Sequence, residues 1–118
     1  MLVVYGLKNC DTCRKATRWL TSEAIDFSFV DVRKDGIDLP EIRKWAAAVG
    51  WEKLLNRQST TWRSLPDALK DEIDEARATA LMADHPALIK RPVFDQAGVI
   101  SVGFKEADKS RLQKQPVS

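Results

Sequence analysis

One stretch near the start of the chain decides the fold: Leu2-Val3-Val4-Tyr5-Gly6-Leu7-Lys8-Asn9-Cys10-Asp11-Thr12-Cys13. It opens on a four-residue apolar run, rich in β-branched side chains and stopped by Gly6, which predicts a buried strand. After a loop over residues 7–10, apolar side chains at helical spacing predict a helix over about 11–24. Residues 26–32 alternate apolar and polar side chains, which predicts a second strand. A strand, a helix and a strand within about thirty residues form a βαβ unit with parallel strands.

The middle of the chain reads as a helical block from about residue 38 to residue 85, with no strand in it. Asp38 and Pro40 provide a helix start, and Gly50 provides a stop. Residues 56–61 are polar and are expected to form a loop. A further helix is predicted up to about residue 73, and Asp74 is expected to cap another that ends at His85 and Pro86.

The end of the chain returns to a strand pattern. Residues 92–94 and 99–102 predict a hairpin with its turn at 95–98, followed by a last helix from 105 to about 112. Residues 113–118 are polar and are expected to fray. Without the helical block, the order is βαβ followed by ββα. The predicted fold class is therefore α/β: a thioredoxin-like fold with a mixed four-stranded sheet and a helical insertion between its halves.

Composition narrows the function. The 118 residues are enough for a single domain, expected to span residues 1–118 as a monomer. The 19 basic and 17 acidic side chains leave a net charge of +2, which argues against a nucleic-acid partner. No secretory signal or long apolar run is visible, so we expect a cytoplasmic protein with no membrane partner. Two cysteines and one histidine are too few for a disulfide framework or a four-ligand metal site, and no metal is expected.

The two cysteines stand together as Cys10-Asp11-Thr12-Cys13, at the point where the first strand feeds a helix. The helix dipole and the free amides of the first turn stabilise negative charge there, so the pKa of Cys10 is expected to be low. Cys10 is the predicted nucleophile and Cys13 the predicted resolving thiol. Two other interpretations stay open. The pair is half of an intersubunit zinc site, or Cys13 is a small buried core residue.

The same helix start is a predicted anion site. Arg91 immediately precedes Pro92, a proline that is typically cis in thioredoxin-like folds and lies against the cysteine motif. Arg57, in the polar loop of the helical block, is a second candidate. For either arginine the alternative is an ordinary solvated charge. His85 and the four tryptophans are interpreted as capping or packing residues.

Five segments carry a resemblance to a known family, and the first lies within the opening stretch. They are Val4 to Thr12, Gly50 to Arg57, Thr60 to Arg63, His85 to Val93 and Val102 to Lys105. In these segments and their order, the chain resembles the arsenate reductase/Spx family, and within it the small bacterial YffB-like proteins. The resemblance implies a thioredoxin-like fold with a helical insertion and places the catalytic cysteine of the family at Cys10. In the arsenate reductases that cysteine attacks arsenate, glutathione then adds, and glutaredoxin completes the reduction.

The resemblance also implies a set of arginines around an oxyanion. One matches Arg91, and another falls at Asn56 or Arg57. The third falls near Gly103, where this chain has no arginine. The reductases carry a histidine and an Asn-Pro pair before the cysteine, whereas Gly6, Leu7 and Lys8 stand here. These departures fit the YffB-like branch, which is associated with glutathione-linked thiol chemistry.

We therefore expect a glutathione-dependent thiol/disulfide reductase that resembles arsenate reductase, with glutathione as reductant, no bound cofactor and glutaredoxin as a further partner. Lys8 and Arg14 are expected to bind the carboxylates of glutathione. Asp11, Thr12 and Pro92 complete the predicted anion-binding group. Two alternatives are arsenate reductase proper and, because the CxxC motif is intact, a redox-switched regulator that binds RNA polymerase as Spx does.

Overall fold

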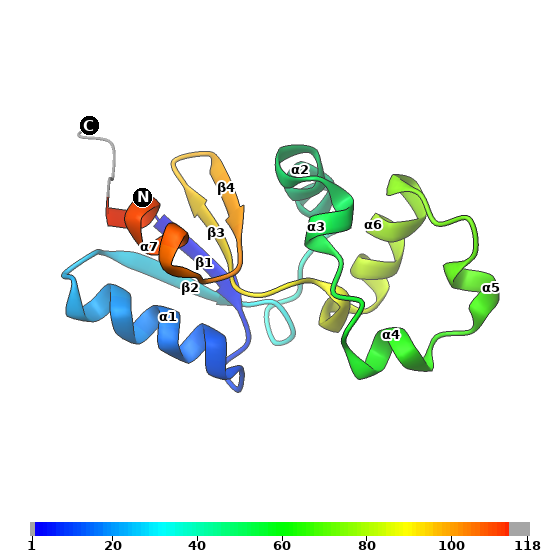
Figure 1. Cartoon of the computed structure of the whole chain (residues 1–118), viewed down its shortest axis with the longest axis horizontal. Helices are drawn as coiled ribbons and strands as arrows, with labels where there is room; N and C mark the ends of the chain where they lie inside the picture. The colour runs from blue at the N-terminus through cyan, green and yellow to red at the C-terminus, as the bar shows by residue number, and fades with distance from the viewer. Residues whose placement is uncertain (1, 114–118) are drawn as a thin grey trace. The chain divides into compact units, whose positions relative to one another are not determined.

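Four strands form one mixed sheet in the computed structural model, which describes residues 2–113. The strands are β1 (Leu2–Gly6), β2 (Phe27–Asp31), β3 (Val93–Gln96) and β4 (Val99–Val102). Their order is β2-β1-β3-β4 (Figure 1). β2 runs parallel to β1, whereas β3 is antiparallel to β1 and to β4. The predicted mixed four-stranded sheet is confirmed.

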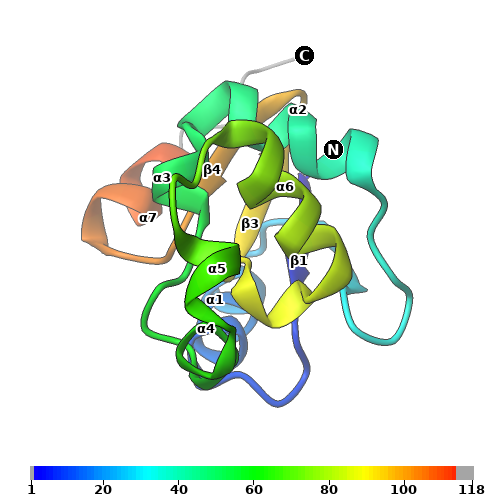
Figure 2. The same cartoon turned by 90° about the vertical axis from the view of Figure 1, so that its right-hand side faces the viewer.

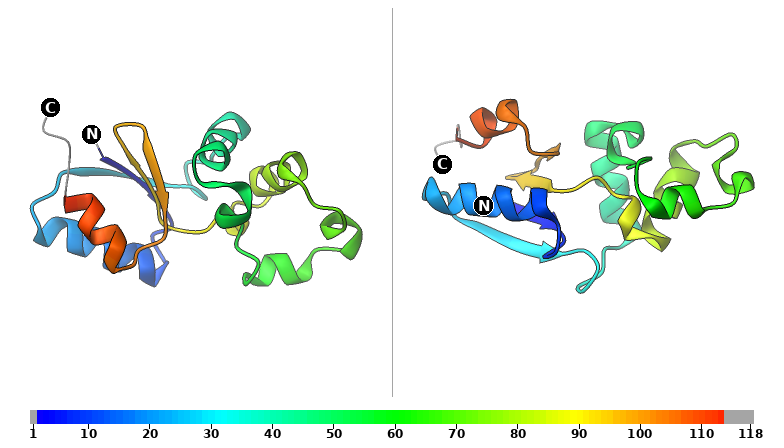
Figure 3. Two further views of the ribbon diagram at one scale, coloured as in Figure 1. Left: turned by 45° about the horizontal axis from the view of Figure 1, so that its top comes forward. Right: turned by 60° about the horizontal axis from the view of Figure 1, so that its bottom comes forward.

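Two helices, α1 (Asp11–Ser22) and α7 (Glu106–Gln113), cover one face of this sheet (Figure 3). Alternate residues of the central strands face them, because side chains along a strand point to opposite faces in turn. The shared core consists of Leu2, Val4, Ala16, Leu20, Phe94 and Leu112. With βαβ followed by ββα around this core, the fold is thioredoxin-like, as predicted.

The residues between the two halves form a compact unit of their own, Arg33–Lys90, while residues 2–32 and 91–113 form the sheet unit. This second unit contains the elements α2 (Leu39–Val49), α3 (Trp51–Leu54), α4 (Thr60–Ser64), α5 (Asp67–Lys70), α6 (Glu75–Asp84) and the 3-10 turn η1 (Pro86–Leu88). Helices α2, α3 and α6 contact one another (Figure 2). Trp45, Leu54 and Met82 are fully buried there. The predicted helical insertion is therefore present.

Side-chain caps fix where the main helices of this unit begin. The Asp38 carboxylate accepts the backbone N–H of Glu41 at 3.3 Å, and the Asp74 carboxylate accepts that of Arg77 at 2.8 Å. Each satisfies an amide that the first helical turn leaves without a partner. Gly50, with φ of 91°, ends α2 in a backbone conformation that glycine adopts readily.

Some predicted boundaries are wrong. The polar run 56–61 is not all loop: Ser59 accepts the N–H of Trp62 at 3.1 Å and caps α4, which begins at Thr60. The helix predicted to reach residue 73 ends at Lys70, because the guanidinium of Arg77 binds the Asp71 carbonyl at 2.8 Å and holds the chain in a turn.

Two other observed boundaries differ from the predicted ones. The helical block continues to Leu88 through the 3-10 turn, and the last helix includes Gln113. The rest of the predicted frayed tail, 114–118, lies outside the described residues. In the part of the chain that the structure describes, no helix is long and apolar enough to cross a bilayer.

Candidate active site

Cys10 occupies the N-cap position of α1, at the end of the loop that leaves β1. Its backbone is extended (φ −96°, ψ 122°), and its carbonyl accepts the first helical hydrogen bond from Arg14 N–H at 2.9 Å. The loop is tight, because the N–H of Cys10 returns to the carbonyl of Leu7 at 3.2 Å. The sequence therefore delivers a half-buried thiol to the positive end of a helix, as predicted.

The environment of Cys10 favours its thiolate. Burial by itself would raise the pKa of this thiol, but three neighbouring groups outweigh it and lower the pKa. The backbone N–H of Cys13, the side chain of Cys13 and the guanidinium of Arg91 each form a hydrogen bond with the Cys10 sulfur. The positive charge of Arg91 adds a coulombic attraction. The direction matches the prediction from the helix start.

Cys13 lies one turn further on and is 1% exposed. Burial raises its pKa to about 12, against a hydrogen bond from the backbone N–H of Leu7 that lowers it. The Cys13 sulfur fills the space beside Gly6, where an added Cβ would stand 2.5 Å from it. Cys13 is thus both a buried core residue and a neighbour of Cys10. The sequence had left a packing role and a role beside Cys10 as alternatives, and the structure is compatible with both at once.

The Arg91–Pro92 peptide bond is cis, as expected from the thioredoxin-like pattern. Pro92 is buried, its carbonyl accepts the N–H of Gly103 at 2.8 Å, and Val93 then begins β3. This anchored turn holds Arg91 against Cys10. Arg91 is therefore the predicted arginine that the sheet unit brings to the thiol.

The other predicted residues of the helix start are exposed. Asp11 and Arg14 form a loose ion pair at 3.9 Å, and both side chains are largely in solvent. Thr12 and Lys8 are exposed as well. The backbone N–H of Lys8 donates to the buried carboxylate of Asp31 at 3.4 Å. Their roles toward an anion stay predictions.

Arg57 belongs to the second unit, so its predicted action on Cys10 also stays a prediction. Its guanidinium lies over the rings of Trp51 and Trp62, 5.8 and 5.9 Å from their centroids. The neighbouring Asn56 accepts the N–H of Gln58 at 3.1 Å and donates its own backbone N–H to Leu88 at 2.7 Å. The two tryptophans, interpreted as packing residues, therefore also hold a cation.

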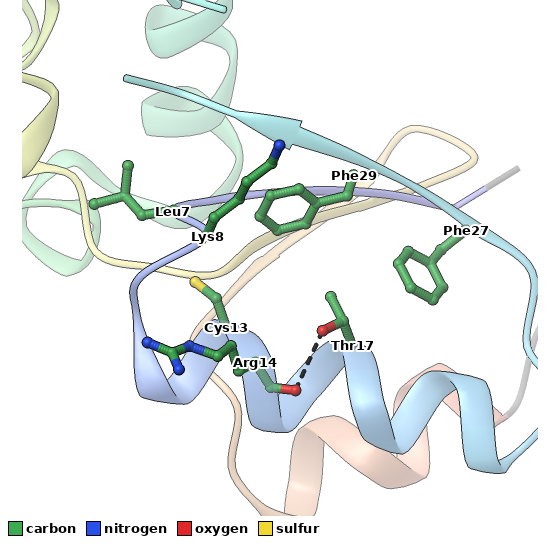
Figure 4. A pocket seen from close by; sticks show the side chains of 7 residues that line it. All are labelled: Leu7, Lys8, Cys13, Arg14, Thr17, Phe27 and Phe29. Atoms are coloured by element: carbon green, nitrogen blue, oxygen red, sulfur yellow. Dashed lines mark hydrogen bonds between the residues drawn. The ribbon is translucent and has the colours of Figure 1, made fainter. Parts of the chain in front are cut away.

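Sequence reasoning missed a pocket of about 280 Å³ beside the second cysteine. Figure 4 shows Cys13 and Thr17 of α1 facing Phe27 and Phe29 of β2. The phenylalanines lie on one side of the strand because they are two residues apart. In the sequence, their alternation predicts only a strand. What shows that they line a pocket rather than the core is the position of β2 at the edge of the sheet.

A thioredoxin-like sheet with a thiolate-stabilising cysteine at the start of its first helix defines a class of thiol-dependent proteins. Comparison with known proteins gives the family: a family model described as the ArsC family matches residues 5–112. The chain therefore belongs to the ArsC family.

Solved and curated relatives agree with this assignment. The chain is 42% identical to the YffB protein, with a TM-score of 0.92 over 96% of this chain and 99% of that one. An ArsC-related protein from Brucella melitensis is also 42% identical, with a TM-score of 0.76 over 96% and 94% of the two chains. The global transcriptional regulator Spx of Enterococcus faecalis is 26% identical over 95% of this chain and 86% of its own.

Proposed function

We propose that this protein is a glutathione-dependent thiol–disulfide reductase in which Cys10 is the nucleophile. The observation that carries the proposal is the surroundings of the Cys10 sulfur, where a backbone N–H, a thiol and Arg91 together lower its pKa. The thiolate is the reactive form of cysteine, so a lowered pKa makes this sulfur more reactive toward disulfides at neutral pH. Membership of the ArsC family supports thiol chemistry at this position.

The reaction has two exchange steps. The Cys10 thiolate attacks the glutathione sulfur of a mixed disulfide, forms a Cys10–glutathione disulfide and expels the other half as a thiolate that takes up a proton. The thiolate of a second glutathione then attacks the glutathione sulfur of that adduct. Oxidised glutathione leaves and the Cys10 thiolate is restored. The sum is one mixed disulfide and one glutathione converted into oxidised glutathione and one free thiol.

Cys13 has a supporting role in this scheme. Cys13 is 1% exposed, and its burial raises its pKa to about 12 while Cys10 is reduced. Poor access and a raised pKa both favour a second glutathione over Cys13, the resolving thiol predicted from the sequence. The Cys13 side chain instead donates to the Cys10 sulfur. Arg14 and Arg91 are proposed to hold the carboxylates of glutathione beside Asp11, Thr12 and Pro92, with Arg57 as a further candidate. Lys8, predicted from the sequence for the same role, lines the neighbouring pocket beside Cys13 and is left for the other half of the disulfide.

Two other functions are weighed against this one. Arsenate reduction is favoured by relatives described as related to arsenate reductase, such as the one from Brucella melitensis. A redox-switched regulator is favoured by the contact between the two cysteines and by the similarity to Spx. In the proposed setting the protein is a cytoplasmic monomer, with glutaredoxin as an optional reductant of the Cys10 adduct.

The test is turnover of the mixed disulfide of glutathione and 2-mercaptoethanol, coupled to the reduction of oxidised glutathione. Wild type is expected to turn over, Cys10→Ser to be inactive, and Cys13→Ser to retain turnover at a lower rate. Glutathione at millimolar concentration is expected to shift the amide resonances of residues 8–14. Turnover that survives Cys10→Ser, or glutathione without an effect on these amides, refutes the proposal.

Two parallel assays decide between the alternatives. Arsenate with glutathione and glutaredoxin replaces the disulfide in the first. In the second, the α subunit of RNA polymerase is captured with reduced and with oxidised protein. Arsenate turnover or redox-dependent capture, without turnover of the mixed disulfide, assigns the protein to the corresponding alternative.

A further inference from the structure

The pocket beside Cys13 is built for an apolar group. Its floor is formed by Thr17 and Cys13 of α1, and its opposite wall by Phe27 and Phe29 of β2 (Figure 4). β2 is the edge strand of the sheet, so both phenylalanine rings are only half-buried although they pack against the core. At about 280 Å³ the pocket is at the small end of ligand sites, large enough for a phenyl ring with a short chain.

Cations border this apolar space. Lys8 is exposed and extends alongside the Phe29 ring (Figure 4). Arg14 also lines the pocket, although the exposed Asp11 partly offsets its charge at 3.9 Å. An apolar pocket with a lysine at its border complements a group that is apolar at one end and anionic at the other.

The pocket also lies next to the reacting thiol. In a thiol–disulfide exchange the attacking and leaving sulfurs lie on opposite sides of the sulfur under attack. The half that is expelled therefore cannot lie against the Cys10 sulfur itself. The pocket does not include Cys10 but begins at Cys13, whose side chain forms a hydrogen bond with Cys10.

We propose that this pocket, lined by Leu7, Lys8, Cys13, Thr17, Phe27 and Phe29, binds the non-glutathione half of the disulfide substrate, and that this half is an aryl or alkyl group bearing a carboxylate. The inference rests on the proposed function and specifies its substrate class. Phe27 and Phe29 contact the apolar part, and Lys8 binds the carboxylate. When Cys10 takes the glutathione sulfur, the expelled thiolate remains in the pocket, takes up a proton and leaves as the free thiol.

Binding is tested without any reaction. The probe is 3-phenylpropionate, titrated into the reduced protein while amide shifts are recorded, with the neutral 3-phenylpropanamide as matched ligand. The acid is expected to shift the amides of residues 7–8, 13–17 and 27–29, and to bind about two- to fivefold more tightly than the amide, as an exposed ion pair allows. No shift in these amides at 10 mM acid overturns the proposal.

Matched variants locate the site. Thr17→Phe fills the pocket and is expected to abolish the shifts. Thr21→Phe, one turn along α1 on an exposed residue, is expected to leave them unchanged; both threonines lose an equivalent side-chain bond to the helix backbone, 3.2 Å at Thr17 and 3.0 Å at Thr21. Lys8→Gln is expected to reduce the affinity for the acid to that for the amide, whereas Lys15→Gln is not. Equal binding by Thr17→Phe and Thr21→Phe overturns the proposal.

Turnover separates this inference from the proposed function. The kcat/KM for the glutathione mixed disulfide of 2-mercapto-3-phenylpropionate is compared with that of 2-mercaptoethanol. A preference of tenfold or more for the aryl acid, lost in Thr17→Phe, supports the pocket. Equal turnover of both substrates overturns it and leaves the reductase standing. Turnover of neither, with 3-phenylpropionate still bound, overturns the reductase and retains an aryl-carboxylate site.

Discussion

Gly6 is the residue on which the close approach of strand and helix depends. It ends β1 directly opposite Cys13, and a Cβ at this position would stand 2.5 Å from the Cys13 sulfur but 3.4 Å from its Cβ. The first distance is a clash and the second an ordinary contact. Any side chain at residue 6 must therefore displace the second cysteine.

We expect Gly6→Ala to lower the free energy of unfolding by about 1–3 kcal/mol, the usual effect of overpacking. Cys13→Ala removes the clashing sulfur. The double variant Gly6→Ala/Cys13→Ala should therefore lose less unfolding free energy than the sum of the losses in the two single variants, by at least about 1 kcal/mol. Urea unfolding of the four proteins measures this coupling. Additive effects would show that the clash is relieved elsewhere.

The pKa of Cys10 gives a second prediction at the same scale. Because Arg91 and the Cys13 groups lower it, the rate of iodoacetamide alkylation should reach half its maximum below the ordinary cysteine value of about 8.5. Arg91→Met removes a hydrogen bond and a positive charge, so the midpoint should rise. Arg18→Met, on the exposed side of α1, is the control and should leave it unchanged.

The same shift affects stability. Since the pKa of Cys10 is lower in the folded than in the unfolded chain, its thiolate contributes stability that is fully present above about pH 8.5. This contribution is lost as the pH falls through the folded-state pKa. An alkylation midpoint at or above the ordinary value would contradict the described environment of the thiol.

At the scale of elements, α6 depends on its cap. The Asp74 carboxylate accepts the N–H of Arg77 at 2.8 Å at the start of a ten-residue helix whose buried face includes Ala78 and Met82. Asp74→Ala is expected to lower the free energy of unfolding by about 1 kcal/mol. Asp71→Ala, at an exposed turn residue just outside the helix, should change it by less than about 0.5 kcal/mol. Urea denaturation measures the free energy of unfolding of both variants. Equal losses would show that the Asp74 cap does not stabilise α6.

On the scale of the whole molecule, both ends of the described chain meet in one core. Leu2 of β1 and Leu112 of α7 are buried in the same cluster with Phe94. We expect Leu112→Ala to cost about 2–5 kcal/mol of unfolding free energy, as for other buried leucines, despite its place in the last helix. The exposed neighbour Ser110→Ala should be close to neutral in the same thermal or urea melt. A neutral Leu112→Ala would mean that α7 does not contribute to the core.

Much of the fold follows from local patterns. The βαβ order, the caps at Asp38 and Asp74 and the existence of the hairpin each rest on short-range chemistry that a sequence displays. The turn of the hairpin was predicted at 95–98, but β3 continues to Gln96 and leaves only residues 97–98 between the strands. Helix α4 was not predicted, because its cap, Ser59, lies within a polar run that is also typical of a loop. The C-terminal end of α5 was predicted wrongly, because the turn that ends the helix is held by Arg77, several residues away in the sequence.

The candidate site likewise has features that local sequence patterns predict and features that depend on contacts between distant residues. The helix start was predictable because strand–loop–helix spacing positions Cys10. The cis proline beside Arg91 was predictable only through the thioredoxin-like order of elements, since an X-Pro pair by itself is usually trans. The raised pKa of Cys13 was not, since it depends on burial against Gly6. The pocket was not predictable either, because Phe27 and Phe29 have the same pattern as core residues, and only the strand order reveals that β2 is an edge.

The insertion has a consequence for how the sheet assembles. β1 pairs with β3, so Leu2 meets Gln96 across nearly the whole chain, and this pairing closes a loop that contains Arg33–Lys90. A flexible loop pays more entropy the longer it is, by about 0.6 kcal/mol for each doubling, and long-range pairings of this kind slow folding. Because residues 33–90 have their own buried core and an internal bridge between Leu55 and Ile89, they form an ordered body rather than slack chain. We therefore expect the insertion to form early in folding, with the central pairing of the sheet as the slow step.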